Sequence, residues 1–270
     1  MKHANWIGEI QLADLFCIFV TKDLRMFRHS GKGRTYLHNL KLASILSGVA
    51  GTVNIVGVLG LNTLTTNITG HFAFLSEEFF LKDYNMVFIY FIYVLFFLFG
   101  AFVSNTLTEL VSKHKPNASY VLPISVEIGV LLIVSCSGLL DIHQVILSPV
   151  LLSCALLFAM GLQNSLVTRV SKSVVRTTHL TGLFTDLGIE LSQLFFYKGV
   201  TERKKLNRSI LLKGAIIGCF FSGGLLGGFA FLSLGVKTLF IPVTLLLFAL
   251  WYDRLLLRFY NIKRRLRNHR

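Results

Sequence analysis

The sequence predicts an all-α protein that crosses a membrane about six times as a bundle of helices. Hydrophobic residues make up 53% of the 270 residues, charged residues only 15%, and the mean hydropathy is +0.65. A water-soluble globule of this size could not bury so much apolar surface. A polar segment that occurs once in each half of the chain further predicts that the bundle is made of two repeats.

Six apolar segments are each long enough to cross the roughly 30 Å hydrocarbon core of a bilayer. They cover residues 42–61, 85–104, 120–139, 146–167, 210–234 and 238–256. The sequence thus divides into a basic cytoplasmic segment (1–40), a transmembrane domain (41–258) and a basic cytoplasmic tail (259–270). Within the first segment, the stretch from Trp6 to Phe16 suits either a helix on the membrane surface or a partly ordered tail.

The segment that occurs twice is the motif TTxxTGxF, at residues 65–72 and again at 177–184. Its glycines, Gly70 and Gly182, are 112 positions apart (182 − 70). Each copy follows a GxxN element, which ends at Asn54 in the first half and at Asn164 in the second. We therefore expect two repeats, about residues 41–140 and 145–256.

The distribution of basic residues favours six crossings over eight. If the motif segments, about 65–81 and 177–197, are short helices that do not cross, only two of the 27 basic residues, Lys82 and Lys237, lie outside. If both segments crossed, about six would lie outside, a poorer fit to the positive-inside rule. With six crossings both termini are cytoplasmic. Three crossings per repeat also force the second repeat to enter the membrane upside down, as in the inverted repeats of many secondary transporters.

Six motif residues are the candidate solute-binding residues: Asn54, Thr69, Gly70, Asn164, Thr181 and Gly182. A carboxamide can bind a solute or join two helices by hydrogen bonds, and the second role is the commoner one. The Thr-Gly pairs precede helical patterns, where free backbone N–H groups and the positive end of the helix dipole favour an anion or a carbonyl. Arg176 could attract an anion toward the motif. The alternative is that the glycines only permit close helix packing.

Four acidic residues are candidates for coupling to protons or cations. Glu78 and Glu190 occupy matching positions of the two repeats, and Asp186 lies one helical turn before Glu190. Glu127 lies well inside the third apolar segment. Acids within a membrane are costly and usually functional. Glu78 could instead face interfacial water, because Lys82 follows closely.

Several other functions are not expected. The net charge of +14 comes from short basic segments between apolar runs, which indicates membrane-protein loops and no nucleic-acid partner. His71 and His179 do not match in register, and no HxxxH or Cys/His cluster predicts a metal site. Phosphate-loop and hydrolase signatures are absent from the sequence, so we expect neither an enzyme nor a cofactor.

Four stretches carry a resemblance to a known family: Leu46 to Asn54, Thr69 to His71, Gly161 to Ser165 and Val174 to Gly188. They resemble the YoaK-like family of small bacterial integral membrane proteins, and the likeness extends from about Arg34 to Tyr252. The resemblance implies a protein of the bacterial inner membrane, sometimes described as a permease, and it implies no substrate. We expect many members to carry Asp where this chain has Asn54, which argues against coupling through a charge at that position.

Together these observations predict a secondary transporter or permease for a small solute, with the lipid bilayer, the solute and a coupling ion as its partners. The alternative is a non-transporting scaffold or lipid-interacting membrane protein, in which the motifs serve helix packing alone. A passive channel is a third hypothesis. Glycines spaced four apart in the segment 210–234 suit packing within the bundle and also a homo-oligomer.

Overall fold

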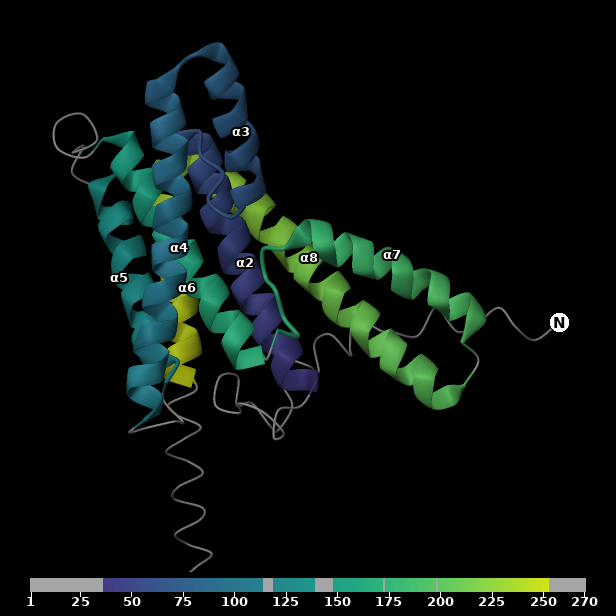
Figure 1. Ribbon diagram of the computed structural model, residues 1–270. Helices are drawn as coiled ribbons and strands as arrows, with labels where there is room; N and C mark the ends of the chain where they lie inside the picture. The colour runs from purple at the N-terminus through teal and green to yellow at the C-terminus, as the bar shows by residue number, and fades with distance from the viewer. Residues whose placement is uncertain (1–35, 114–118, 139–147, 172, 198, 253–270) are drawn as a thin grey trace, which may run out of the picture.

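The computed structural model describes residues 36–113, 119–138, 148–171, 173–197 and 199–252, and these residues are helical apart from short connections (Figure 1). The helices are α2 (Tyr36–Leu61), α3 (Ile68–Leu81), α4 (Tyr84–Ser112), α5 (Val121–Ser137), α6 (Pro149–Ser171), α7 (Leu180–Phe196), α8 (Val200–Leu234) and the short 3-10 helix η4 (Gly235–Leu239). A last helical segment covers residues 240–252. The predicted all-α class is confirmed, while the stretch from Trp6 to Phe16, for which the sequence left a surface helix and a partly ordered tail open, lies outside the described residues.

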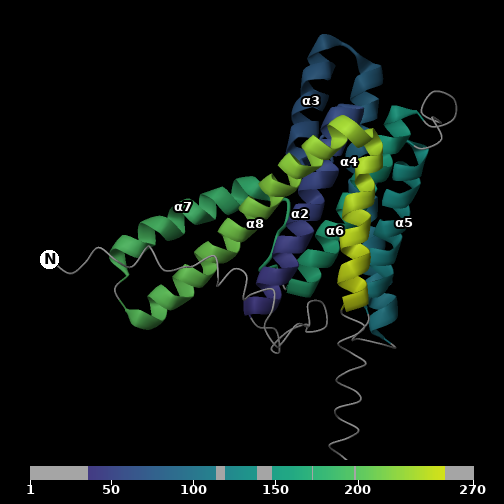
Figure 2. The same ribbon diagram turned by 180° about the vertical axis from the view of Figure 1, so that it is seen from behind.

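Four helical stretches are long and apolar enough to cross a membrane: Tyr36–Leu61, Tyr84–Ser112, Pro149–Ser171 and Val200–Tyr252. The last of them has 53 residues because α8, η4 and the segment 240–252 follow one another without a break. Figure 2 shows that the chain reverses at η4, so this stretch forms two roughly antiparallel helices, α8 and the segment 240–252. Helix α5 is apolar but shorter. Each predicted apolar segment therefore coincides with a helix in the described residues.

Two helices extend well beyond their apolar segments. α4 continues to Ser112 and α8 begins at Val200, although the apolar segments end at residue 104 and begin at residue 210. Hydropathy marks the part of a helix that suits lipid, and it does not mark the helix ends. The charged stretch after Val200 consists mainly of residues with ordinary helix propensity, so the helix can start there.

The two halves of the chain, residues 36–138 and 148–252, pack against each other in a reciprocal way. The helix that precedes the first motif copy, α2, packs most extensively against α8, which follows the second copy. Likewise α6, which precedes the second copy, packs against α4, which follows the first. α3 lies along α4 and α7 along α8. The apolar core is built mainly from α2, α5, α6 and the segment 240–252.

Glycines bring the backbones of these helix pairs into direct contact. A Cβ atom added to Gly51 on α2 would collide with the carbonyl oxygen of Phe220 on α8. The same collision would occur between Gly161 on α6 and Phe97 on α4. Gly51 and Gly161 begin the two GxxN elements, so each element marks a helix crossing that admits no side chain.

The motif helices α3 and α7 leave the bundle's centre in different directions, α3 along the bundle and α7 to its side (Figures 1 and 2). After α2 the chain folds back beside Asn54, and α3 then runs to the end of the bundle where α4 begins. After α6 it folds back beside Asn164, and α7 then projects sideways, away from the bundle, together with the first part of α8.

Adding one methyl group at a helix crossing should destabilise the bundle. A Cβ atom at Gly223 on α8 would collide with the carbonyl oxygen of Gly48, whereas one at Gly218, on the same helix, would meet nothing within 4 Å. We expect Gly223→Ala to lower the free energy of unfolding by about 1–3 kcal/mol, measured by thermal unfolding in detergent. Gly218→Ala is the matched control and should be neutral or slightly stabilising. Equal effects of the two substitutions would contradict the close crossing.

Candidate functional site

A cavity of about 590 Å³ lies between the two halves of the chain, where both motif segments fold back. Its lining comes largely in matched pairs: Asn54 with Asn164, Thr66 with Thr178, Asn67 with His179, Ile68 with Leu180, Thr69 with Thr181, and Phe97 with Phe220. Leu64, Arg176 and Thr168 also line it. Because each half contributes one member of every pair, neither half could form this cavity alone.

Each cavity asparagine is held by a threonine of the adjacent motif. The Thr66 hydroxyl donates a hydrogen bond of 2.9 Å to Asn54 Oδ1, and the Thr178 hydroxyl donates one of 2.8 Å to Asn164 Oδ1. These bonds use the amide oxygens and leave both Nδ2 groups without a hydrogen bond to another described residue. The two NH₂ groups are therefore available as donors to a molecule in the cavity.

The chain returns to the cavity through a tight reversal after each helix. After α2, Asn62 has a positive φ of 50° and the Thr63 N–H donates to the carbonyl of Gly57 at 3.0 Å. The Thr63 hydroxyl also contacts Ser153 Oγ on α6 at 2.8 Å. After α6, Ser173 has a positive φ of 63°. Each reversal places the motif threonines beside the asparagine about two turns before the end of the preceding helix.

The first turns of α3 and α7 both lie at the cavity, through Ile68 and Thr69 in one half and Leu180 and Thr181 in the other. The first N–H groups of a helix have no partner within it, and the helix dipole gives that end a partial positive charge. In α3 the Asn67 side chain accepts a hydrogen bond from the Gly70 N–H, while His179 makes no such bond in α7. The second half therefore leaves more of these donors free.

The two candidate glycines shape the helix starts and do not line the cavity. A Cβ atom at Gly182 would collide with the ring of His179, and one at Gly70 would press on Leu64. Of the six predicted site residues, the cavity thus brings together Asn54, Thr69, Asn164 and Thr181. Glycine is needed at the other two positions so that the residue before each helix can fold over its first turn.

The described lining carries one permanent charge, the guanidinium group of Arg176, and no acidic side chain. Its counterpart in the first motif is Leu64. The lining therefore combines hydroxyl, amide and backbone donors with a single cation. Two aromatic rings, those of Phe97 and Phe220, add apolar surface. Such a site suits a solute that carries hydrogen-bond acceptors, such as an anion or a carbonyl compound.

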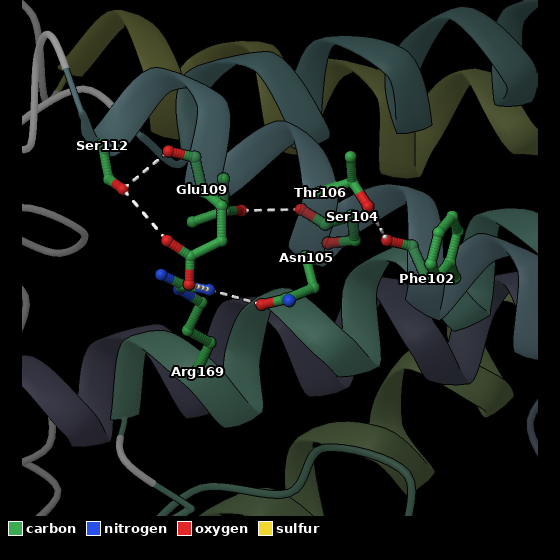
Figure 3. Close-up of polar contacts among 8 residues, drawn as sticks. Phe102, Ser104, Asn105, Thr106, Glu109, Ser112 and Arg169 are labelled. Carbon is green, nitrogen blue, oxygen red and sulfur yellow. Dashed lines mark hydrogen bonds and ion pairs between the residues drawn. The ribbon is translucent and has the colours of Figure 1, made fainter.

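An ion pair fixes the end of α6 from which the second motif departs (Figure 3). Arg169, next to the cavity residue Thr168, contacts Glu109 Oε1 on α4 at 2.7 Å and donates a short hydrogen bond to Asn105 Oδ1. The Ser112 hydroxyl donates to the backbone carbonyl of Glu109 at 2.9 Å. A solvent-exposed ion pair contributes little to stability. We therefore infer that the main role of this pair is to fix the position of α6 along α4.

The four acidic candidates lie away from the cavity. Glu78 and Glu190 come ten residues after the starts of their helices, about 15 Å along the helix axis. Asp186 is exposed on α7, and the Glu78 carboxylate makes no hydrogen bond or ion pair with another described residue. Glu190 is paired with Lys213 on α8 at 2.6 Å. Glu127 on α5 is only 1% exposed, and its Oε1 has no partner among the described residues.

Four of the six matched pairs of lining residues were not among the predicted site residues: Thr66 with Thr178, Asn67 with His179, Ile68 with Leu180, and Phe97 with Phe220. Thr66 and Thr178 belong to the repeated motif, so their role could have been found by asking what holds each asparagine. Phe97 and Phe220 belong to no motif, and each lies three residues before a glycine at a helix crossing, Gly100 or Gly223. That spacing could have predicted the place of the two phenylalanines only if the helix crossings at Gly100 and Gly223 had been known.

The hydrogen bond between Thr178 and Asn164 should be measurable as a coupling energy. We expect Thr178→Val and Asn164→Ala each to lower the free energy of unfolding, and the double variant to lose about 0.5–1.5 kcal/mol less than the sum. Thermal unfolding in detergent of the four proteins in this cycle provides the measurement. Additive losses would show that the two side chains do not interact in the folded protein.

Comparison with known proteins identifies the family and leaves its function open. The model of a family described as "Protein of unknown function (DUF1275)" matches residues 42–252, which include both motif copies and the whole described bundle beyond the first turns of α2. No curated protein and no solved structure matches the sequence. The chain therefore belongs to the DUF1275 family of proteins of unknown function.

Proposed function

We propose that this protein is a secondary transporter or permease for a small solute, located in the inner membrane of a bacterium. The observation that carries the proposal is the cavity between the two halves, lined in matched pairs by residues at the starts of two short helices. Secondary transporters bind their solutes at such places, where helices are broken and two related halves meet.

The proposed topology has six crossings in two inverted repeats. The four long apolar stretches support it, because the longest consists of two roughly antiparallel helices and α5 adds a shorter apolar helix. This topology requires that the α3–α4 turn and the α7–α8 turn lie on opposite sides of the membrane. Both termini would then face the cytoplasm.

The proposed solute carries hydrogen-bond acceptors, and the groups that line the cavity favour an anion over a neutral solute. The free Nδ2 groups of Asn54 and Asn164, the first turns of α3 and α7, and Arg176 all offer positive or hydrogen-donating groups to the same cavity. The lack of an acidic side chain among the described lining residues favours the same class. Phe97 and Phe220 would contact an apolar part of the solute.

Coupling to an ion gradient would involve an acidic group outside the cavity. Glu127 is our first candidate, because the bundle buries it without a cationic partner among the described residues, and such acids commonly mark proton or ion pathways. Glu190 is the second, because it binds Lys213 and Ser209 between α7 and α8. Both would act by changing the packing of helices that border the cavity.

A bulky side chain at the start of α7 should block the site without preventing membrane insertion. Thr181 lines the cavity, whereas Thr185, one turn further along the same helix, is exposed and does not. We expect Thr181→Leu to abolish both solute uptake into proteoliposomes and solute-induced thermal stabilisation, and Thr185→Leu to preserve them. Acetate, sulfate and inorganic phosphate are the first probes. A bound solute at a hundredfold excess over its dissociation constant should add about 2.7 kcal/mol of stability.

Two outcomes would contradict the proposal. Normal uptake by the Thr181→Leu protein would show that the cavity is not the solute site. If no solute stabilises the protein, while Asn54→Ala and Asn164→Ala still lower its stability, the motifs serve packing alone and the protein is a scaffold.

A further inference from the structure

The α7–α8 hairpin extends away from the bundle as an arm, which we define as α7 together with residues 200–213 of α8 (Figures 1 and 2). Its two helices hold each other through polar contacts. Glu190 Oε1 accepts hydrogen bonds of 2.6 Å from both Ser209 Oγ and Lys213 Nζ. Nearer the tip, the Arg203 guanidinium donates to the carbonyl of Leu194 at 3.3 Å. The arm is thus braced along its length by its own residues.

The tip of the arm presents uncovered aromatic and aliphatic side chains. Phe195 is 82% exposed, Phe196 is 80% exposed and Val200 is 84% exposed. Tyr197 lies between them and is also exposed. Aromatic side chains of membrane proteins concentrate at the boundary between hydrocarbon and headgroups, where an apolar ring and a polar edge are both accommodated. This tip therefore suits a position at the membrane–water interface.

Beside these aromatic side chains stand four basic residues in one stretch of α8: Arg203, Lys204, Lys205 and Arg208. The same stretch has a single acidic residue, Glu202. Arg208 lies over the ring of Tyr36 on α2. The side chains of Lys204 and Lys205 are exposed and form no ion pair or hydrogen bond with another described residue, although Lys205 also lines the hollow between α7 and α8 with Glu190 and Glu202. Their charges are available to a partner outside the described protein.

The corresponding turn of the first half also has exposed aromatic residues, but it lacks the excess of basic residues. Phe80, in the last turn of α3, is 84% exposed, and Tyr84, the first residue of α4, is 62% exposed. The charged residues around that turn are one cation, Lys82, and three acids, Glu77, Glu78 and Asp83. An interfacial position therefore explains the aromatic residues of both turns, and a cytoplasmic position accounts for the excess of basic residues on the arm.

We propose that the tip of the α7–α8 arm binds anionic phospholipid headgroups of the cytoplasmic leaflet. The occupant follows from charge complementarity, because exposed cations next to interfacial aromatic rings fit the negative surface of that leaflet. The binding brings the start of α8 to the membrane surface and holds the arm there. This inference requires the chain to span a membrane and is independent of transport.

Quenching of a single tryptophan by brominated lipids tests the proposal. On a background with Trp6→Phe and Trp251→Phe, Phe196→Trp reports on the arm and Phe80→Trp on the turn of the first half. Each protein is reconstituted with either brominated phosphatidylglycerol or brominated phosphatidylcholine at the same small mole fraction. One basic residue near an anionic surface contributes about 1 kcal/mol, or about fivefold. We therefore expect the Phe196→Trp protein to favour the anionic quencher at least fivefold.

The controls separate charge attraction from simple contact with lipid. Lys204→Gln with Lys205→Gln should lower the preference of the Phe196→Trp protein for the anionic quencher at least fivefold, and high salt should also lower it. The Phe80→Trp protein should show no preference for the anionic lipid, since the residues around its turn carry a net negative charge. Equal quenching of the Phe196→Trp protein by the two lipids would overturn the proposal. Absence of quenching by either lipid would also overturn it, because protein, such as a second copy of the chain, would then cover the tip.

Discussion

The direct contact between helix backbones at Gly51 and Gly161 is the constraint on which the rest of the structure depends. Each glycine lets a helix of one half lie against the backbone of a helix from the other half, at Phe220 and at Phe97. Each asparagine of the candidate site lies three residues later, about one turn further along the same helix. The two crossings therefore set the distance between the halves and the position of both asparagines. The cavity is the space that remains between these crossings and the first turns of α3 and α7.

The two halves have the same arrangement of helices, but the second half contributes more positive and hydrogen-donating groups to the cavity than the first. Asn67 caps the first turn of α3, whereas His179 leaves the first turn of α7 without a side-chain cap. Arg176 stands in the second half where the first half has Leu64. A solute with one negative group would thus meet its strongest partners at α7. The same half carries the arm, so its motif helix is attached at one end to the cavity and at the other to the proposed lipid site.

The repeated motif predicted where the cavity lies, because its two copies bring the same polar side chains, an asparagine and two threonines from each half, to one place. Sequence also predicted that the glycines permit close packing and that the motif segments are short helices. It could not predict Phe97 and Phe220, whose place in the cavity follows from crossings between distant helices. Nor could it pair Glu190 with Lys213, because the relative rotation of α7 and α8 is set by tertiary packing.

The measurement that tests the inverted arrangement most directly is the side of the membrane reached by each motif helix. In a protein without its four native cysteines, Cys17, Cys136, Cys154 and Cys219, one cysteine replaces Asp83 and, in a second protein, one replaces Thr201. Both positions are exposed, in the α3–α4 turn and near the start of α8. With an impermeant thiol reagent on intact cells, we predict labelling at position 83 from outside and protection at position 201. Protection of both positions would place the two turns on the cytoplasmic side, make the halves parallel and contradict the account.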